Sequence, residues 1–206
     1  MVVMSIEEAH PQQRPLTVKD LERMPDDGSR YELAEGRLEV SPAPTFIHSL
    51  INDRLSFALN RQAPKGFTVV SGAGINFDAD RTHHRVPDLS VIPRAARETP
   101  YLTQAPLLAV EIVSKSSVFH DHHTKRTEYA KFGIESYWII NPDLENPGIL
   151  ELRLEDGQYR DASRAFGCDL FTTEAPFPVT LVPYWLVADS DDWQDEIGGS
   201  DTSEEA

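Results

Sequence analysis

The chain of 206 residues contains a single cysteine, Cys168, and no long hydrophobic run. One cysteine excludes an intrachain disulfide and is typical of proteins from a reducing compartment. No stretch approaches the ~20 apolar residues that a membrane-spanning helix needs. Residues 1–8 lack a basic region followed by an apolar one, so no secretory signal is visible. We therefore predict a cytoplasmic protein with no membrane partner.

Positive charge is also scarce, because 19 basic residues face 34 acidic ones and the net charge is −15. Such acidity disfavours tight nonspecific binding to nucleic acid. The imbalance is uneven: residues 189–206 contain eight acids and no Lys or Arg, which predicts a disordered acidic tail. Residues 81–131 instead contain eight bases against five acids, together with five of the seven histidines. This electropositive stretch suits a phosphate-bearing substrate.

Hydrophobic patterning predicts a single domain at 17–188, between a flexible arm at 1–16 and the acidic tail. Helices are expected at 17–24, 45–60 and 120–132, a hairpin at 31–40, and strands at 67–70, 75–77, 88–92, 107–113, 136–142, 150–154, 158–159 and 177–181. This order of elements predicts a mixed α/β domain whose central sheet is flanked by helices.

An acidic residue, Glu111, interrupts the otherwise apolar run at 107–113. A carboxylate on a buried strand costs free energy unless a cation lies against it. Asp88 follows Pro87 at the start of another predicted strand, and two carboxylates on neighbouring strands would repel unless a divalent cation lay between them. We therefore predict that Asp88 and Glu111 bind Mg²⁺, with Mn²⁺ as a substitute. Such an ion polarises a phosphoryl oxygen and lowers the pKa of a bound water.

The residues alone leave alternatives to this magnesium site. Glu111 would also be satisfied at an exposed sheet edge or beside a core arginine. The histidine-rich segments 83–84 and 120–123 offer a transition-metal site. However, His122 and His123 cannot both face one ion from a regular helix, and no cysteine supports them. We expect these histidines to line the cleft, where they can contact phosphate.

A longer series of motifs resembles one known family. The series comprises Pro87-Asp88, Glu111-Ile112-Val113-Ser114, Asp121, Lys125, Tyr129-Ala130 and residues 133–142, preceded by the hairpin at 31–36, Pro42 and His48. Across residues 17–187, their order and spacing resemble the bacterial Uma-two family (Uma2) of restriction-endonuclease-like proteins, part of the PD-(D/E)XK nuclease superfamily. The resemblance implies a restriction-endonuclease-like core with an N-terminal helix and hairpin. It also implies DNA as the substrate and Asp88 and Glu111 as metal ligands.

One position departs from the superfamily pattern, which has a lysine two residues after the second acid, where this chain has Val113. A valine cannot orient water or stabilise a charged phosphorus. The resemblance implies that a lysine of the following helix replaces it, and Lys125 matches that position. A long side chain on that helix can reach back over the carboxylates. Lys125 would equally suit a solvated helix face beside Arg126 and Glu128.

Four residues form a second tier of site candidates: Glu32, His48, Lys115 and Asp121. The resemblance places Glu32 and His48 near the cleft, whereas an outward hairpin position and a polar helix start are their alternatives. Lys115 is a weaker substitute for the missing lysine, because it lies past the expected end of its strand.

The sequence thus predicts a Mg²⁺-dependent endonuclease of DNA, in which Lys125 positions the attacking water or stabilises developing charge. The alternative is a catalytically inactive nuclease-fold protein that serves as a binding or assembly module, which Val113 and the acidic charge favour. Cleavage of both DNA strands would favour a homodimer, which no residue specifies.

Overall fold

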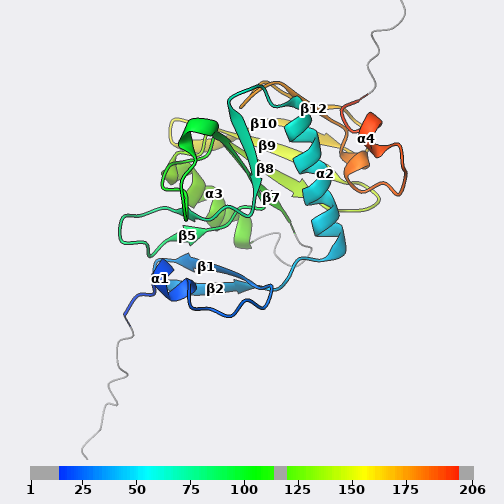
Figure 1. Ribbon diagram of the computed structural model, residues 1–206. Coiled ribbons are helices and arrows are strands. Elements are labelled where there is room, and N and C mark those ends of the chain that lie inside the picture. Colours follow the sequence, from blue (N-terminus) through cyan, green and yellow to red (C-terminus); the bar gives the residue numbers. More distant parts are fainter. Residues whose placement is uncertain (1–13, 114–119, 200–206) are drawn as a thin grey trace, which may run out of the picture.

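The computed structural model describes residues 14–113 and 120–199 (Figure 1). Its centre is a six-stranded sheet in the order β10-β9-β8-β7-β6-β3. These strands are β3 (Phe67–Ser71), β6 (Leu89–Pro93), β7 (Leu108–Ile112), β8 (Ser136–Asn141), β9 (Gly148–Glu155) and β10 (Gln158–Phe166). Strands β7 and β8 are parallel, and the other neighbouring pairs of this sheet are antiparallel. The mixed α/β class predicted from the sequence is confirmed.

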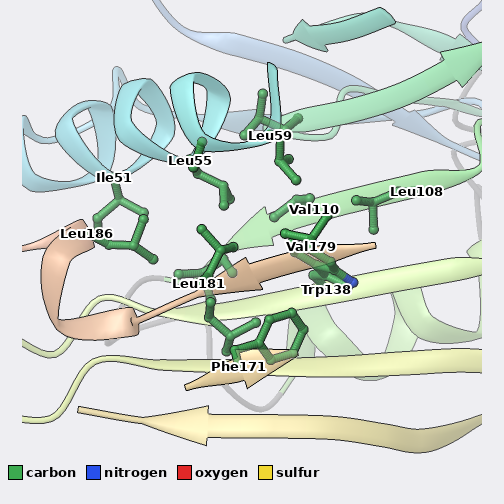
Figure 2. Close-up of a cluster of buried hydrophobic side chains, with 14 of the residues drawn as sticks. Ile51, Leu55, Leu59, Leu108, Val110, Trp138, Phe171, Val179, Leu181 and Leu186 are labelled. Carbon is green, nitrogen blue, oxygen red and sulfur yellow. The ribbon is translucent and has the colours of Figure 1, made fainter. Parts of the chain in front are cut away.

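Two helices cover opposite faces of the central sheet. Side chains alternate between these two faces along each strand, so each face has its own set of side chains to pack against a helix. Helix α2 (Phe46–Gln62) buries Leu55 and Leu59 in one cluster with Val110 and Trp138 (Figure 2). Helix α3 (His120–Phe132) lies on the other side, where its Tyr129 packs with residues of β7 and β8. Both helices match their predicted ranges closely. The α2 face is therefore an apolar core, and polar functional side chains can be placed on the α3 face.

A second sheet in the order β2-β1-β5-β4 lies beside the α3 end of the central sheet (Figure 1). Its strands are β1 (Arg30–Ala34), β2 (Arg37–Ser41), β4 (Ile75–Asn76) and β5 (His84–Arg85), and the short helix α1 (Val18–Leu21) precedes them. Glu35 and Gly36 form the β1–β2 turn with φ of 49° and 77°. A two-residue hairpin turn of type I′ requires positive φ at both of its central residues. At Gly36, an added Cβ would also lie 2.4 Å from Pro15 Cβ. This glycine thus sets the position of the hairpin.

The C-terminal part of the described chain packs on α2. It contains β11 (Phe171–Thr173), β12 (Val179–Leu181), the short 3₁₀ helix Pro183–Leu186 and α4 (Trp193–Glu196). Another short 3₁₀ helix, Arg94–Ala96, directly follows β6. The predicted disordered tail from residue 189 is wrong for residues 189–199. Trp193 packs edge-on against Phe57 at 5.2 Å between ring centroids, and Ile197 is 2% exposed. These two apolar residues dock a segment whose charge alone suggested disorder, while residues 200–206 lie outside the described range.

Among the described residues, no helix combines the length and apolar character that crossing a membrane requires.

Candidate active site

Asp88 and Glu111 come together at one end of the strand pair β6–β7. The pairing is antiparallel with Leu89 opposite Val110, so the same register continued by one residue brings Asp88 opposite Glu111. Both side chains are buried, with exposures of 3% and 6%. The proximity that the sequence predicts for these two carboxylates is therefore present in the fold.

The Asp88 carboxylate is surrounded by donors. Its Oδ1 accepts a hydrogen bond from Arg30 Nη2 at 2.5 Å, and its Oδ2 accepts one from the Ile112 N–H at 2.7 Å. His48 Nε2 also lies 3.2 Å from Oδ2. Burial raises the pKa of Asp88, but the hydrogen bond with His48 and the charge of Arg30 outweigh burial, so the pKa lies below its ordinary value. Asp88 is thus held in its ionised form.

Glu111 has a different environment. Its Oε1 accepts hydrogen bonds from Lys125 Nζ at 3.1 Å and from the Tyr129 hydroxyl at 2.6 Å. Burial, together with the nearby charges of Asp88 and Glu32, raises the pKa of Glu111 to about 7, although Lys125 opposes this rise. Additional positive charge at this site would therefore favour the ionised form of Glu111.

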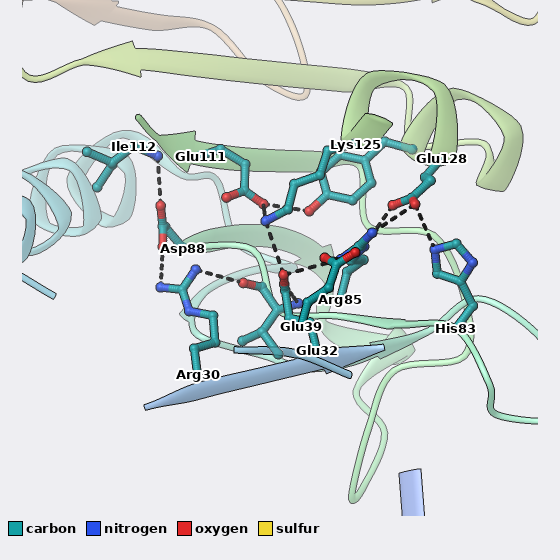
Figure 3. Close-up of polar contacts among 12 residues, drawn as sticks. Arg30, Glu32, Glu39, His83, Arg85, Asp88, Glu111, Ile112, Lys125 and Glu128 are labelled. Atoms are coloured by element: carbon teal, nitrogen blue, oxygen red, sulfur yellow. Dashed lines mark hydrogen bonds and ion pairs between the residues drawn. The ribbon is translucent and has the colours of Figure 1, made fainter. Parts of the chain in front are cut away.

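Lys125 lies between two carboxylates on the buried side of α3. Its Nζ is 3.4 Å from Glu32 Oε2 as well as 3.1 Å from Glu111, and the residue is 5% exposed. The alternative that Lys125 belongs to a solvated helix face is therefore wrong. Figure 3 shows the Lys125 side chain reaching Glu111. Residues four apart on a helix share a face, so Tyr129 reaches Glu111 as well.

Glu32 connects the hairpin to the strand entrance that carries Asp88. It lies on β1, where its Oε1 accepts a hydrogen bond from the Val86 N–H at 2.7 Å and its Oε2 lies 3.5 Å from Arg85 Nη1. The structure thus places both Glu32 and His48, the two described second-tier candidates, beside the predicted carboxylates. Lys115 and the side chain of Asp121 lie outside the described residues.

Arg85 is the centre of a network of ion pairs around the site, which the sequence did not predict. The buried guanidinium donates to Glu128 on α3 at 2.7 and 2.8 Å and also to Glu39 on β2 (Figure 3). Glu128 lies 3.2 Å from His83 Nε2 as well. Burial raises the pKa of Glu128, yet its contacts with His83 and Arg85 lower it to about 2. This network fixes α3 against the hairpin and so fixes Lys125 over Glu111.

The family of the chain follows from comparison with known proteins. The model of the Uma2 family, described as "Putative restriction endonuclease", matches residues 18–182. The chain belongs to the Uma2 family. A solved structure from Anabaena variabilis ATCC 29413, titled "a putative nuclease belonging to DUF820", is similar to the chain, with 20% identity and a TM-score of 0.61 over 78% of this chain and 90% of that one. This likeness shows a shared fold, while no curated protein matches.

The histidines of this Uma2 protein divide between the site and the core. His84 is buried and its Nδ1 is 2.8 Å from Asn76 Oδ1. Its burial lowers its pKa to about 4, so the ring is neutral near pH 7. The expectation that it lines a cleft is wrong, because alternation along β5 directs Arg85 to the site and His84 to the opposite side. The side chains of His120 and His122 lie outside the described residues.

Asp88 and Glu111 at the Uma2 site supply carboxylate oxygens, which are the ligand type that Mg²⁺ takes in proteins. Among the described residues, no group of three or more His, Cys, Asp or Glu side chains is arranged to hold a metal. Mg²⁺ keeps several waters and binds proteins through one or two carboxylates, which is what Asp88 and Glu111 provide. The carboxylates of Asp88 and Glu111 also have the negative charge that a small divalent cation requires.

Proposed function

We propose that this Uma2 protein is a Mg²⁺-dependent endonuclease that hydrolyses phosphodiester bonds in DNA. The observation that carries the proposal is the convergence of two buried carboxylates, Asp88 and Glu111, beside a buried lysine. Membership in a family described as "Putative restriction endonuclease" supports the reaction class and DNA as its substrate. Asp88 and Glu111 would hold the ion, with Mn²⁺ as a substitute.

A bound Mg²⁺ would polarise a phosphoryl oxygen and acidify a water. The chain supplies the rest. Lys125 brings a fixed positive charge to the place where negative charge develops on the phosphate. Its contacts with Glu32 and Glu111 hold Nζ in place before substrate arrives. Lys125 therefore replaces the lysine that the superfamily carries two residues after the second acid.

The proposal is tested with Asp88→Asn and Glu111→Gln, which keep the shape of each side chain. We expect both variants to lose Mn²⁺ binding in calorimetry and cleavage of supercoiled plasmid, because a neutral amide is a poor ligand for a hard cation. Glu155→Gln serves as the control, since Glu155 is an exposed acid on β9. Cleavage that persists in both site variants would contradict the assignment.

One observation favours a second candidate, a catalytically inactive nuclease-fold protein that serves as a binding module. Val113 is 7% exposed at the position where the superfamily has its lysine. A module of this kind would bind DNA without binding Mn²⁺. Calorimetry on the wild-type protein separates the two candidates, because only the enzyme gives heat on Mn²⁺ addition that Glu111→Gln abolishes.

A further inference from the structure

Arg30 closes the site from its solvent side. It is the first residue of β1, and its guanidinium donates to Asp88 Oδ1 at 2.5 Å (Figure 3). It also donates to the Val86 carbonyl at 3.1 Å. The Arg30 side chain is 27% exposed, whereas that of Asp88 is 2% exposed. Arg30 is thus a charged side chain that reaches the buried pair from the edge of the site.

Each of the two predicted metal ligands is paired with a different cation. Lys125 lies between Glu32 and Glu111, and Arg30 pairs with Asp88. The two cations differ in access, because Lys125 is buried under α3 while Arg30 has a path to solvent. Arg30 is therefore the cation that can leave without exposing the core.

A divalent ion and the Arg30 guanidinium compete for one carboxylate. Mg²⁺ binds oxygen at about 2.0–2.1 Å and demands near-octahedral geometry. Arg30 already occupies Asp88 Oδ1, and Ile112 and His48 lie against Oδ2. Two positive groups on one carboxylate repel each other. Of these three neighbours, the Ile112 N–H is fixed in the backbone of β7, and the Arg30 guanidinium is the one that always carries a positive charge, so Arg30 is the group that must yield.

A guanidinium displaced from Asp88 at this edge of the site is able to bind a phosphate group. Arginine presents a planar fork that matches two phosphate oxygens, and its long stem allows the head group to swing while the backbone stays in the hairpin. We propose that Arg30 occupies the cation position of the site until a divalent ion displaces it from Asp88, and that the released guanidinium then binds the phosphate of the DNA substrate. This inference rests on the proposed nuclease function.

Mn²⁺ calorimetry on Arg30→Met tests the displacement. Removal of the competing cation is expected to strengthen Mn²⁺ binding by roughly tenfold, the equivalent of one charge-assisted hydrogen bond. The same variant is expected to raise KM for DNA cleavage, because the phosphate contact is lost. Arg160→Met is the matched control: Arg160 pairs with Glu155 at 3.2 Å on the exposed β9–β10 hairpin, and its loss should leave Mn²⁺ affinity unchanged.

The outcomes separate this inference from the proposed function. If wild type binds Mn²⁺ and Arg30→Met binds it equally or more weakly, Arg30 is a structural residue and the inference is overturned while the nuclease proposal stands. If only Arg30→Met binds Mn²⁺, the competition is supported and the metal-dependent function of the wild type is not. If neither protein binds, both proposals fail.

A second measurement on the wild type covers the case in which Arg30→Met does not fold. The side-chain Nε–H resonance of Arg30 in a ¹⁵N spectrum, assigned with Arg30→Lys, is followed during Mg²⁺ titration. The Ile112 amide donates to Asp88 and reports ion binding independently. We expect both resonances to shift together. A shift of the Ile112 amide with a stationary Arg30 signal would show that the guanidinium stays in place and would overturn the inference.

Discussion

The two faces of the central sheet carry different kinds of side chains. On the α2 face, Leu55 and Leu59 pack with Val110 and Trp138 in an apolar core. On the α3 face, the neighbouring β7 residue Glu111 meets a lysine, a tyrosine hydroxyl and two more carboxylates. One residue along a single strand separates these two environments, because consecutive side chains point to opposite sides.

This contrast teaches which face serves stability and which serves chemistry. Apolar burial stabilises a fold by ~1.5–3 kcal/mol for each large side chain. A buried ion pair contributes little net stability, since desolvation offsets its attraction, and well-packed apolar residues often stabilise as much or more. A network of charges from β1, β2, β5, β7 and α3 is therefore not explained by stability, and strongly shifted pKa values are typical of functional sites.

The largest expected effect comes from Arg85→Met. Arg85 contacts Glu32, Glu39 and Glu128, so its loss leaves three carboxylates without their shared cation. We expect a loss of about 3–5 kcal/mol in the free energy of unfolding, measured by urea denaturation. Arg126→Met is the control, because Arg126 lies on α3 like Glu128, but its ion-pair partner Asp161 is 3.9 Å away in an exposed pair. Its other contact is a hydrogen bond to the Tyr159 carbonyl at 2.8 Å. Equal effects of the two substitutions would mean that the charged face is ordinary surface.

Leu55→Ala tests the opposite face. We expect it to lower the free energy of unfolding by about 2–5 kcal/mol through the cavity it leaves. Because Leu55 faces away from the carboxylates, Mn²⁺ affinity should stay at the wild-type value under conditions where the variant is folded. A large fall in Mn²⁺ affinity for folded Leu55→Ala would show that the two faces are not separate in function.

Local patterns predicted most of the fold and the centre of the site. The spacing of apolar residues is a property of each segment, so α2, α3 and the β1–β2 hairpin were predictable. The acid in an apolar run pointed to Glu111 in the same way. The two-residue strand β5 was too short to give a pattern.

Arg30 and Arg85 needed the three-dimensional structure. Their partners lie on strands and helices 43 to 58 positions away in the sequence, so no short-range spacing reveals them. One signal was available: Arg30 and Glu32 alternate on β1 and therefore point to the same side as each other. That alternation gives a shared side but does not identify the carboxylate that it faces.

The pH dependence of stability sharpens the contrast between the faces. The pKa of Glu111 is raised to about 7, above its unfolded value of ~4.5, so protonated Glu111 contributes stability that is lost as pH rises through 7. Glu111→Gln removes this titration. We expect the loss of stability between pH 5 and pH 8 to be smaller in the variant, by on the order of 2 kcal/mol.

Urea denaturation at both pH values checks this expectation. The pKa of His84 is lowered to about 4, so His84 makes the folded state more stable as the pH rises through the lower part of the same range. This contribution is the same in wild type and variant and therefore cancels in the comparison. Parallel pH profiles for wild type and Glu111→Gln would show that Glu111 does not titrate in this window. Glu111 would then make no contribution to the pH dependence of the free energy of unfolding.

The smallest expected effect separates a site tyrosine from a structural one. Tyr129 donates to Glu111 at 2.6 Å, and Tyr159 donates to the Ile134 carbonyl at 2.7 Å. Tyr129→Phe and Tyr159→Phe should each lower the free energy of unfolding by about 1.5 kcal/mol. Only Tyr129→Phe should weaken Mn²⁺ binding at pH 7, because its hydrogen bond lowers the pKa of Glu111 and so favours the ionised ligand. The difference should shrink at pH 8.5, where Glu111 is ionised in both proteins; a deficit that persists there would mean that Tyr129 acts on the geometry of Glu111 rather than on its charge.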